Sequence, residues 1–198
     1  MNKQIPELSF VDIEKGDSNS INILSDALED HGFFSITEHG LSNELVDKCY
    51  QLSKQFFNLE YETKNKYSSV GSKGARGYTP KGIETAVGEN VPDQKEFWHH
   101  GPVVDDTFDQ KIPKNIIIEE MPEFNKYYDE LYLELHKIGS RVLSVIALSL
   151  EIDKNFFTPW IEKGNSLLRS IHYPPVDSNL NPHRAVSYTH LTLPTRAQ

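Results

Sequence analysis

The chain has 198 residues, and its 20 lysines and arginines against 29 aspartates and glutamates give a formal net charge of −9 at pH 7. This length suits one domain with a sizeable core, or one domain and part of another. The acidic balance, with no basic block, argues against a nucleic-acid partner, because phosphate binding needs clustered basic residues. The chain has a single cysteine, Cys49, and its N-terminus has no apolar signal core. Its longest apolar stretch covers only residues 142–150. These features predict a cytoplasmic protein with no membrane association.

The first sixty residues predict alternating strands and helices. Residues 8–13 form a short apolar stretch typical of a strand, and residues 19–30 carry apolar side chains at helical spacing that ends before Gly32. A second strand is expected over residues 33–37, which are aromatic and β-branched, before a helix that Ser42 caps. The predicted order is therefore strand, helix, strand, helix, joined by short turns.

The remaining chain predicts a glycine-rich loop, two strands and a long helix. Residues 70–88 contain five of the eleven glycines and are expected to form a long loop, followed by a strand over residues 94–99. Apolar positions at helical spacing run from 122 to 150, a helix about 43 Å long at 1.5 Å per residue. A short helix over residues 156–161 and a strand over residues 167–173 complete the order.

The predicted strand over residues 167–173 carries an arginine. Period-two alternation places Arg169 and Tyr173 on one face, and apolar residues on both faces predict a strand that is covered on both sides. An arginine there needs either a protein carboxylate or an anionic ligand, and both interpretations stay open. The two side chains start about 13 Å apart, so we expect one to contact a ligand and the other to contact the surrounding wall.

The glycine-rich loop and a histidine pair are further candidates for chemistry. The loop matches no phosphate-binding motif, but Arg76, Thr79 and Glu84 give it the polar content of a cleft for a charged small molecule. A mobile surface loop is the alternative. His99 and His100 are neighbours on a predicted strand, so they point to opposite faces and are not expected to hold one metal ion.

A series of short motifs runs in order between residues 4 and 185. They are Ile5-Pro6 with Val11-Asp12-Ile13, His31-Gly32-Phe33-Phe34 with His39-Gly40-Leu41, Phe56-Phe57 with Lys64 and Tyr67, Arg76-Gly77-Tyr78 with Glu84, Asp93-Gln94-Lys95-Glu96, Leu168-Arg169 with His172-Tyr173-Pro174-Pro175, and His183-Arg184-Ala185. In this order and spacing the series resembles the isopenicillin N synthase-like family of 2-oxoglutarate/Fe(II)-dependent oxygenases.

The resemblance implies a fold and an activity. The expected fold is a mixed α/β N-terminal region over residues 4–119, leading into an incomplete double-stranded β-helix (jelly roll) with a long backing helix over residues 120–185. In such enzymes two histidines and one carboxylate hold Fe(II). 2-Oxoglutarate decarboxylation and O2 activation then drive hydroxylation, desaturation, ring closure or ethylene formation on a small molecule. The full-length protein is expected to be a monomer.

The resemblance also implies site residues. Arg169 and Tyr173 fall where family members contact the cosubstrate or the substrate, so they are the candidate cofactor-binding residues. Arg76 and Glu84 fall on the loop that covers the substrate pocket, and they are the candidate substrate-binding residues. A carboxylate resembling Glu84 occurs in the ethylene-forming branch, which also oxidises arginine, and it would suit a cationic substrate.

The pattern breaks after Ala185. Family members continue into a His-x-Asp that supplies two iron ligands, whereas this chain has a displaced His190 and a threonine, Thr192. Residues 186–195 instead resemble a translated transposase sequencing adapter, so residues 186–198 are expected to be a non-native tail. We therefore expect that the 198-residue chain lacks the iron ligands, is inactive, and binds neither Fe(II) nor 2-oxoglutarate.

Two alternatives remain, one from another class of protein and one with a sibling chemistry. One is a non-catalytic module that binds a ligand or partner through the loop over residues 71–88. The other is an oxidase of the isopenicillin N synthase type, which closes rings without 2-oxoglutarate. The missing strands of a jelly roll would also leave residues 167–173 at an unpaired sheet edge, which favours aggregation.

Overall fold

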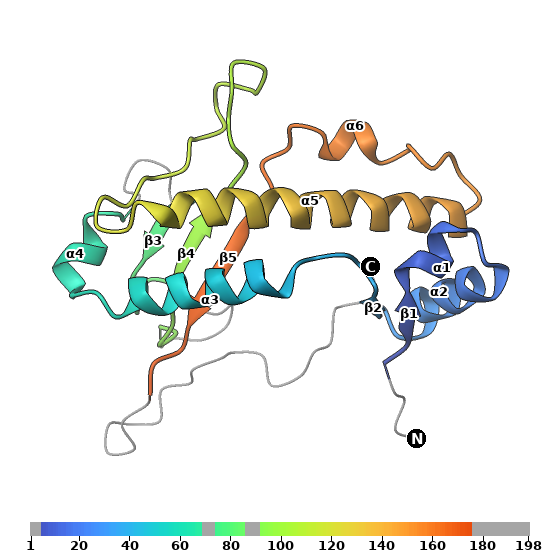
Figure 1. The fold of residues 1–198 in the computed structure, drawn as a ribbon, viewed down its shortest axis with the longest axis horizontal. Coiled ribbons are helices and arrows are strands. Elements are labelled where there is room, and N and C mark those ends of the chain that lie inside the picture. The colour runs from blue at the N-terminus through green and yellow to red at the C-terminus, as the bar shows by residue number, and fades with distance from the viewer. Residues whose placement is uncertain (1–4, 69–73, 86–91, 176–198) are drawn as a thin grey trace. The chain divides into compact units, whose positions relative to one another are not determined.

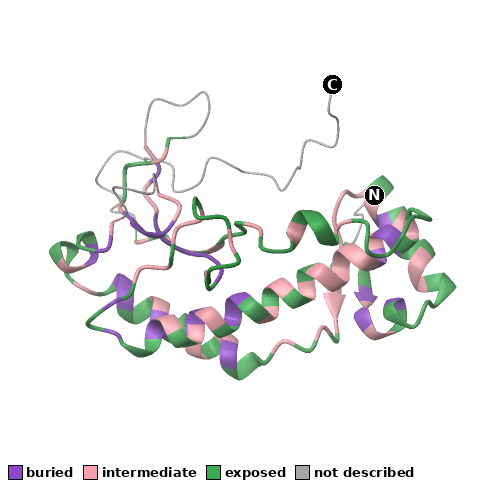
Figure 2. Ribbon diagram, turned by 90° about the horizontal axis from the view of Figure 1, so that it is seen from above, coloured by how far each residue is buried: buried purple, intermediate pink, exposed green. Residues whose placement is uncertain are grey.

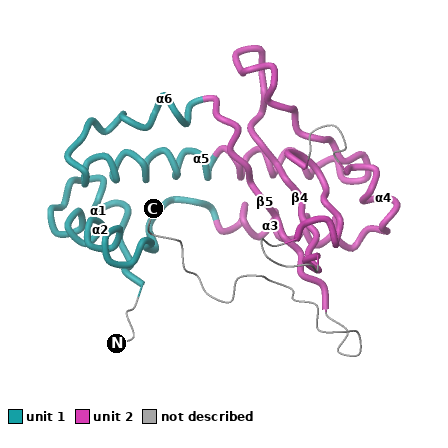
Figure 3. Tube along the Cα trace, turned by 180° about the vertical axis from the view of Figure 1, so that it is seen from behind, with its two compact units in different colours: residues 1–42, 134–162, 192–198 teal, residues 43–133, 163–191 magenta. Residues whose placement is uncertain are grey.

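The computed structural model describes residues 5–68, 74–85 and 92–175 (Figure 1). The chain divides into two compact units (Figure 3). Of the described residues, the first unit contains those within 1–42 and 134–162, and the second contains those within 43–133 and 163–175. The long helix α5 (Glu123–Ser149) contributes residues to both units. Within the described residues no helix is both long enough and apolar enough to cross a bilayer.

The first unit opens with a strand that turns directly into a helix. Its elements are β1 (Glu7–Ser9), α1 (Phe10–Glu14), α2 (Ser18–Asp30), β2 (Ser35–Thr37), the C-terminal part of α5, and α6 (Thr158–Ile161). The strand predicted over residues 8–13 was therefore too long. The Ser9 side chain accepts a hydrogen bond from the Asp12 backbone N–H at 3.2 Å, and this N-cap starts α1 where the strand was expected to continue.

A small apolar core holds the first unit together. The parallel strands β1 and β2 pair Leu8 with Ile36. Their neighbours in the core are buried apolar side chains from α1, α2 and α5, namely Phe10, Ile13, Leu24 and Val145. Arg141 of α5 covers this core, because its guanidinium lies 4.3 Å from the Phe10 ring centroid and donates to Glu14 through Nε at 2.7 Å. The ion pair thus ties α5 to α1.

The second unit is a three-stranded sheet with helices on one face. Its elements are α3 (Asn43–Phe57), α4 (Tyr61–Asn65), β3 (Gly77–Thr79), β4 (Glu96–His100), the N-terminal part of α5, and β5 (Leu168–His172). The strand order is β3-β4-β5 and both pairings are antiparallel. Aromatic rings connect the sheet to the helices. The ring centroid of Trp98 in β4 lies 5.0 Å from that of Phe56 in α3 and 5.2 Å from that of Phe124 in α5.

Strand β5 is an edge strand among the described residues, paired only with β4. Its residues alternate in burial: Leu168, Ser170 and His172 are half-buried, whereas Arg169 and Ile171 are exposed. Figure 2 colours the whole ribbon by the burial of its residues. Whether strands beyond residue 175 would pair with the free side of β5 stays a prediction. The prediction that both faces of the strand are covered was wrong, because Arg169 and Ile171, which lie on one of its faces, are exposed.

Candidate functional site

Alternate residues of the three strands give the sheet two faces. The helix face carries Tyr78, Glu96, Trp98, His100, Ser170 and His172. The opposite face, which carries Gly77, Thr79, Phe97, His99, Arg169 and Ile171, is called the open face because it lies away from the helices. Its β3 and β4 residues are buried, and its two β5 residues, Arg169 and Ile171, are exposed. The strand register aligns Gly77, His99 and Arg169 in one row across the open face. This row brings a predicted site residue, Arg169, beside a histidine that the sequence had not assigned to the site.

Arg169 is held on the open face by three contacts. Its Nε donates to Nε2 of His99 at 2.6 Å, and its guanidinium carbon lies 4.2 Å from the centroid of the Phe97 ring. Its Nη2 donates to Oε1 of Glu84 at a longer distance, 3.4 Å. The sequence left either a protein carboxylate or an anionic ligand open as the partner of Arg169. The structure shows a protein carboxylate, that of Glu84.

His99 is neutral, and its tautomer follows from its partners. Its Nε2 accepts the bond from Arg169, so the ring proton is on Nδ1, which donates to the Gly74 carbonyl at 2.6 Å. Burial lowers the pKa of His99, and the positive charge of Arg169 lowers it further against the opposing effect of the Gly74 carbonyl. An uncharged imidazole is thus available to orient the arginine.

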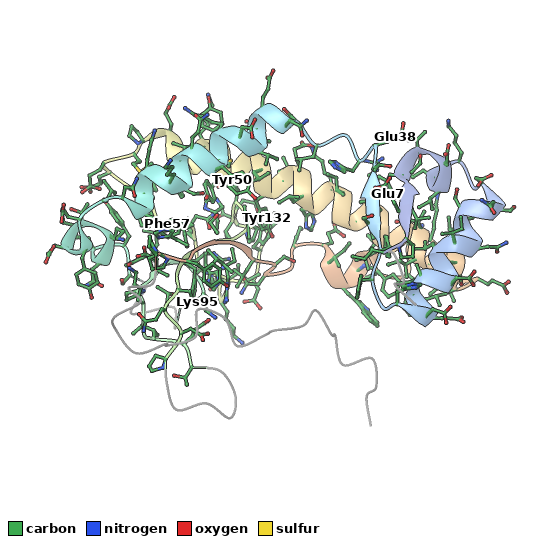
Figure 4. All side chains as sticks on the ribbon, turned by 90° about the horizontal axis from the view of Figure 1, so that it is seen from below. Glu7, Glu38, Tyr50, Phe57, Lys95 and Tyr132 are labelled. Carbon is green, nitrogen blue, oxygen red and sulfur yellow. The ribbon has the colours of Figure 1, made fainter. Side chains whose placement is uncertain are left out.

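Glu84 lies between two cations. Its Oε2 is 3.0 Å from Nζ of Lys95, which also donates to Asp93 at 2.8 Å. A backbone bond from Asp93 N–H to the Glu84 carbonyl, 2.8 Å long, fixes the segment that carries Glu84. Burial lowers the pKa of Lys95, but the hydrogen bonds to Asp93 and Glu84 outweigh this effect and the net pKa is raised. In Figure 4 the labelled Lys95 and the labelled Phe57 of α3 lie on different sides of the strands.

The other two predicted site residues lie elsewhere. Arg76 is buried, and it donates through Nη2 to Asn165 at 2.6 Å and through Nη1 to the Ala75 carbonyl at 2.7 Å. Tyr173 directly follows β5 and its side chain is exposed. The structure therefore brings Arg169 and Glu84 into contact, whereas Arg76 lies in the interior with partners of its own.

The helix face holds a buried carboxylate that sequence reasoning also missed. Oε2 of Glu96 accepts from Nζ of Lys64 at 2.8 Å and from the Tyr78 hydroxyl, and Oε1 lies 2.7 Å from Nδ1 of His172. Burial raises the pKa of Glu96, but the hydrogen bonds from Lys64, Tyr78 and His172 outweigh it, and the net pKa is lowered. The signal was present, because charged residues inside a predicted strand need buried partners.

Neither face offers a metal centre within the described ranges. His99 and His100 do lie on opposite faces, as their neighbouring positions predict, and Nε2 of His100 contacts Asp129 at 2.7 Å. Across residues 5–68, 74–85 and 92–175, no three histidine, cysteine, aspartate or glutamate side chains gather as metal ligands do. The iron implied by the sequence resemblance therefore finds no fitting donor set in this part of the chain. Residues 183–198, which carry the expected break in the motif, lie outside the described residues.

Comparison with known proteins identifies the family. Residues 5–120, more than half of the chain, match the family described as the non-haem dioxygenase in morphine synthesis N-terminal region. The chain therefore belongs to this family, within the 2-oxoglutarate/Fe(II)-dependent oxygenases.

Relatives and solved structures agree with this family. The chain is 29% identical to a 2-oxoglutarate-Fe(II) type oxidoreductase of Aspergillus fumigatus, in a match that covers 73% of this chain and 46% of that protein. It is 25% identical to gibberellin 20 oxidase 2 of Arabidopsis thaliana, in a match that covers 86% of this chain and 46% of that protein. The solved structure of a 2OG-Fe(II) oxygenase family protein of Caulobacter crescentus superposes on this chain with a TM-score of 0.78 at 36% identity. The match covers 88% of this chain and 58% of that one.

A second solved structure shares the fold at lower identity. It is a full-length Neurospora crassa protein in complex with alpha-KG, with a TM-score of 0.72 at 22% identity, covering 90% of this chain and 58% of that one. The chain thus spans about half the length of the curated relatives that it matches.

Proposed function

We propose that these residues belong to an oxidoreductase that uses 2-oxoglutarate, O2 and non-haem Fe(II) to oxidise a small molecule. Family membership over residues 5–120 supports the reaction class. The observation that carries a role for this chain is the preorganised Arg169, which His99 and Phe97 hold on the open face of the sheet. A fixed guanidinium on such a surface suits a carboxylate.

We propose distinct roles for the four candidate site residues. Arg169 binds a carboxylate of the cosubstrate or substrate, and Tyr173 lines the same wall. Glu84 acts from the neighbouring segment, where its contact with Arg169 supports a place at the ligand. Arg76 acts indirectly, because it is buried and bonded to Asn165.

Fe(II) supplies the oxidising chemistry when it is bound, and we propose that residues beyond those described here supply its ligands. In this proposal residues 4–119 are the N-terminal region, residues 120–185 begin the jelly roll, and residues 186–198 are a non-native tail. The 198-residue chain then binds Fe(II) no better than an arbitrary acidic protein and turns over no 2-oxoglutarate. Calorimetric titration with Fe(II) under anaerobic conditions checks this, and a single tight site would contradict it.

The activity is tested on the native gene. Sequencing the genomic locus beyond codon 185 should give His-x-Asp, a later histidine and Arg-x-Ser in place of the tail. Expression of that reading frame should yield a protein that forms succinate from 2-oxoglutarate with Fe(II) and O2. Oxygen consumption without succinate would instead favour the 2-oxoglutarate-independent oxidase. A genomic stop codon after Gln198, with neither activity, would favour the non-catalytic binding module.

A further inference from the structure

The carboxylate of Glu84 contacts the guanidinium of Arg169 through its Nη2 donor. Its two oxygens are divided between Arg169, at 3.4 Å, and Lys95, at 3.0 Å. Both oxygens therefore contact cations of the chain itself. This arrangement does not favour Glu84 as a receptor for a cationic ligand.

The contact between Arg169 and Glu84 is the weakest of those that hold the two residues. Arg169 keeps its bond to His99 at 2.6 Å and its place over the Phe97 ring without Glu84. Glu84 keeps the shorter ion pair with Lys95, whose side chain is only 16% exposed. The long contact can therefore open while both partners stay in position.

We propose that Glu84 is an intramolecular competitor at a carboxylate-binding site on Arg169. An incoming carboxylate takes the Nη2 donor of Arg169, and Glu84 remains on Lys95. The exposed side chains of Ile171 and Tyr173 are 42% and 43% accessible and offer apolar surface on and directly after the same strand. The expected ligand is thus a carboxylate attached to a short hydrocarbon chain. The inference deepens the proposed function by naming the charge of the ligand, and it rests on that function for its biological meaning.

The test is a binding measurement on the 198-residue chain with glutarate as the probe. Glutarate has no keto group, so its contact with Arg169 needs no iron and is distinct from the iron-dependent binding of 2-oxoglutarate that is not expected of this chain. Amide and Arg169 Nε–H signals are followed by NMR during the titration. Removal of the competitor in Glu84→Gln should tighten glutarate binding roughly two- to fivefold, the range expected for a half-exposed ion pair. Lys95→Met should weaken binding, because Glu84 then has Arg169 as its remaining cation. Arg169→Gln should abolish the saturable shift.

Two control variants separate competition from a general change in charge. Glu14→Gln removes a carboxylate that pairs with Arg141 in the other unit, and it should leave glutarate binding unchanged. Asp93→Asn removes a carboxylate that contacts Lys95 but is not bonded to Arg169, and its effect should be smaller than that of Glu84→Gln. Well-dispersed spectra establish that each variant is folded.

Several outcomes would overturn the proposal. One is the absence of glutarate binding both in the unmodified chain and in Glu84→Gln. Another is equal tightening by Asp93→Asn. A third is saturable binding of methylguanidinium that Glu84→Gln abolishes, because Glu84 would then receive a cation. Binding is measured without iron or turnover, so failure of the oxidase activity in the longer gene product would leave this result unaffected.

Discussion

On the helix face of the sheet the Glu96 side chain is 2% exposed, whereas on the open face the Glu84 side chain is 37% exposed. Each carboxylate contacts a lysine and one further basic side chain, His172 for Glu96 and Arg169 for Glu84. The difference lies in what surrounds them. Glu96 is enclosed by helices and strands, so its carboxylate is shielded from water, whereas solvent reaches Glu84. The same strands thus carry a closed network on one side and a solvent-accessible one on the other.

The largest effect is expected from neutralising the buried carboxylate. Glu96→Gln would leave the Lys64 ammonium, 9% exposed, without its counter-charge, and loss of one partner of a buried pair costs about 3–5 kcal/mol. Urea unfolding of the variant and the unmodified chain measures this loss. A change below about 1 kcal/mol, the range of exposed pairs, would mean that the helix face is not closed.

A smaller effect is expected at a glycine of the open face. Gly77 has φ +78°, and a β-carbon there would lie 2.4 Å from the Tyr67 carbonyl oxygen. Gly77→Ala should cost about 1–2 kcal/mol for the left-handed backbone and roughly 1–3 kcal/mol more for the overlap. Urea unfolding measures the total loss of unfolding free energy.

Gly16→Ala is the matched control for Gly77→Ala. Gly16 has nearly the same φ, +79°, and a β-carbon added there would meet nothing within 4 Å, so only the backbone cost applies. Equal losses of unfolding free energy in the two alanine variants would show that the close approach of Tyr67 does not constrain β3.

A still smaller effect concerns pH. The folded pKa of His99 is lowered, so the unfolded chain binds the proton more tightly. The neutral, buried His99 is therefore fully compatible with the fold above the unfolded pKa of about 6.5. As the pH falls below that value, the unfolding free energy decreases by at most about 1.4 kcal/mol per pH unit. Unfolding free energies between about pH 7.5 and pH 5.5, one unit either side of that pKa, should fall less steeply in His99→Gln. Identical slopes in the variant and the unmodified chain would contradict the burial of a neutral His99.

The sequence predicted the long elements better than the short ones. The helix expected over residues 122–150 is α5 (Glu123–Ser149), because sustained helical spacing depends on many residues. The short strand β3 lay hidden in the predicted glycine-rich loop, since its pairing with β4 is a long-range contact. Local propensity carries no information about such a partner.

The candidate site was predicted in part. Arg169 and Glu84 were named, and the structure brings them together. The roles of His99 and Lys95 depend on contacts to Arg169 and Glu84, 70 and 11 residues away, which spacing rules do not reach. Arg76 carried the same charge signal as Arg169, and only the packing of the chain distinguishes a buried arginine from an exposed one.

The contrast between the two faces is tested most directly by the same chemical change on both. Unfolding free energies of Glu84→Gln and Glu96→Gln are measured in the same urea titration series. We expect a loss of about 0.2–1 kcal/mol for Glu84→Gln, and a loss at least about 2 kcal/mol larger for Glu96→Gln. Equal losses in the two variants would contradict the contrast between a closed carboxylate network and a solvent-accessible one.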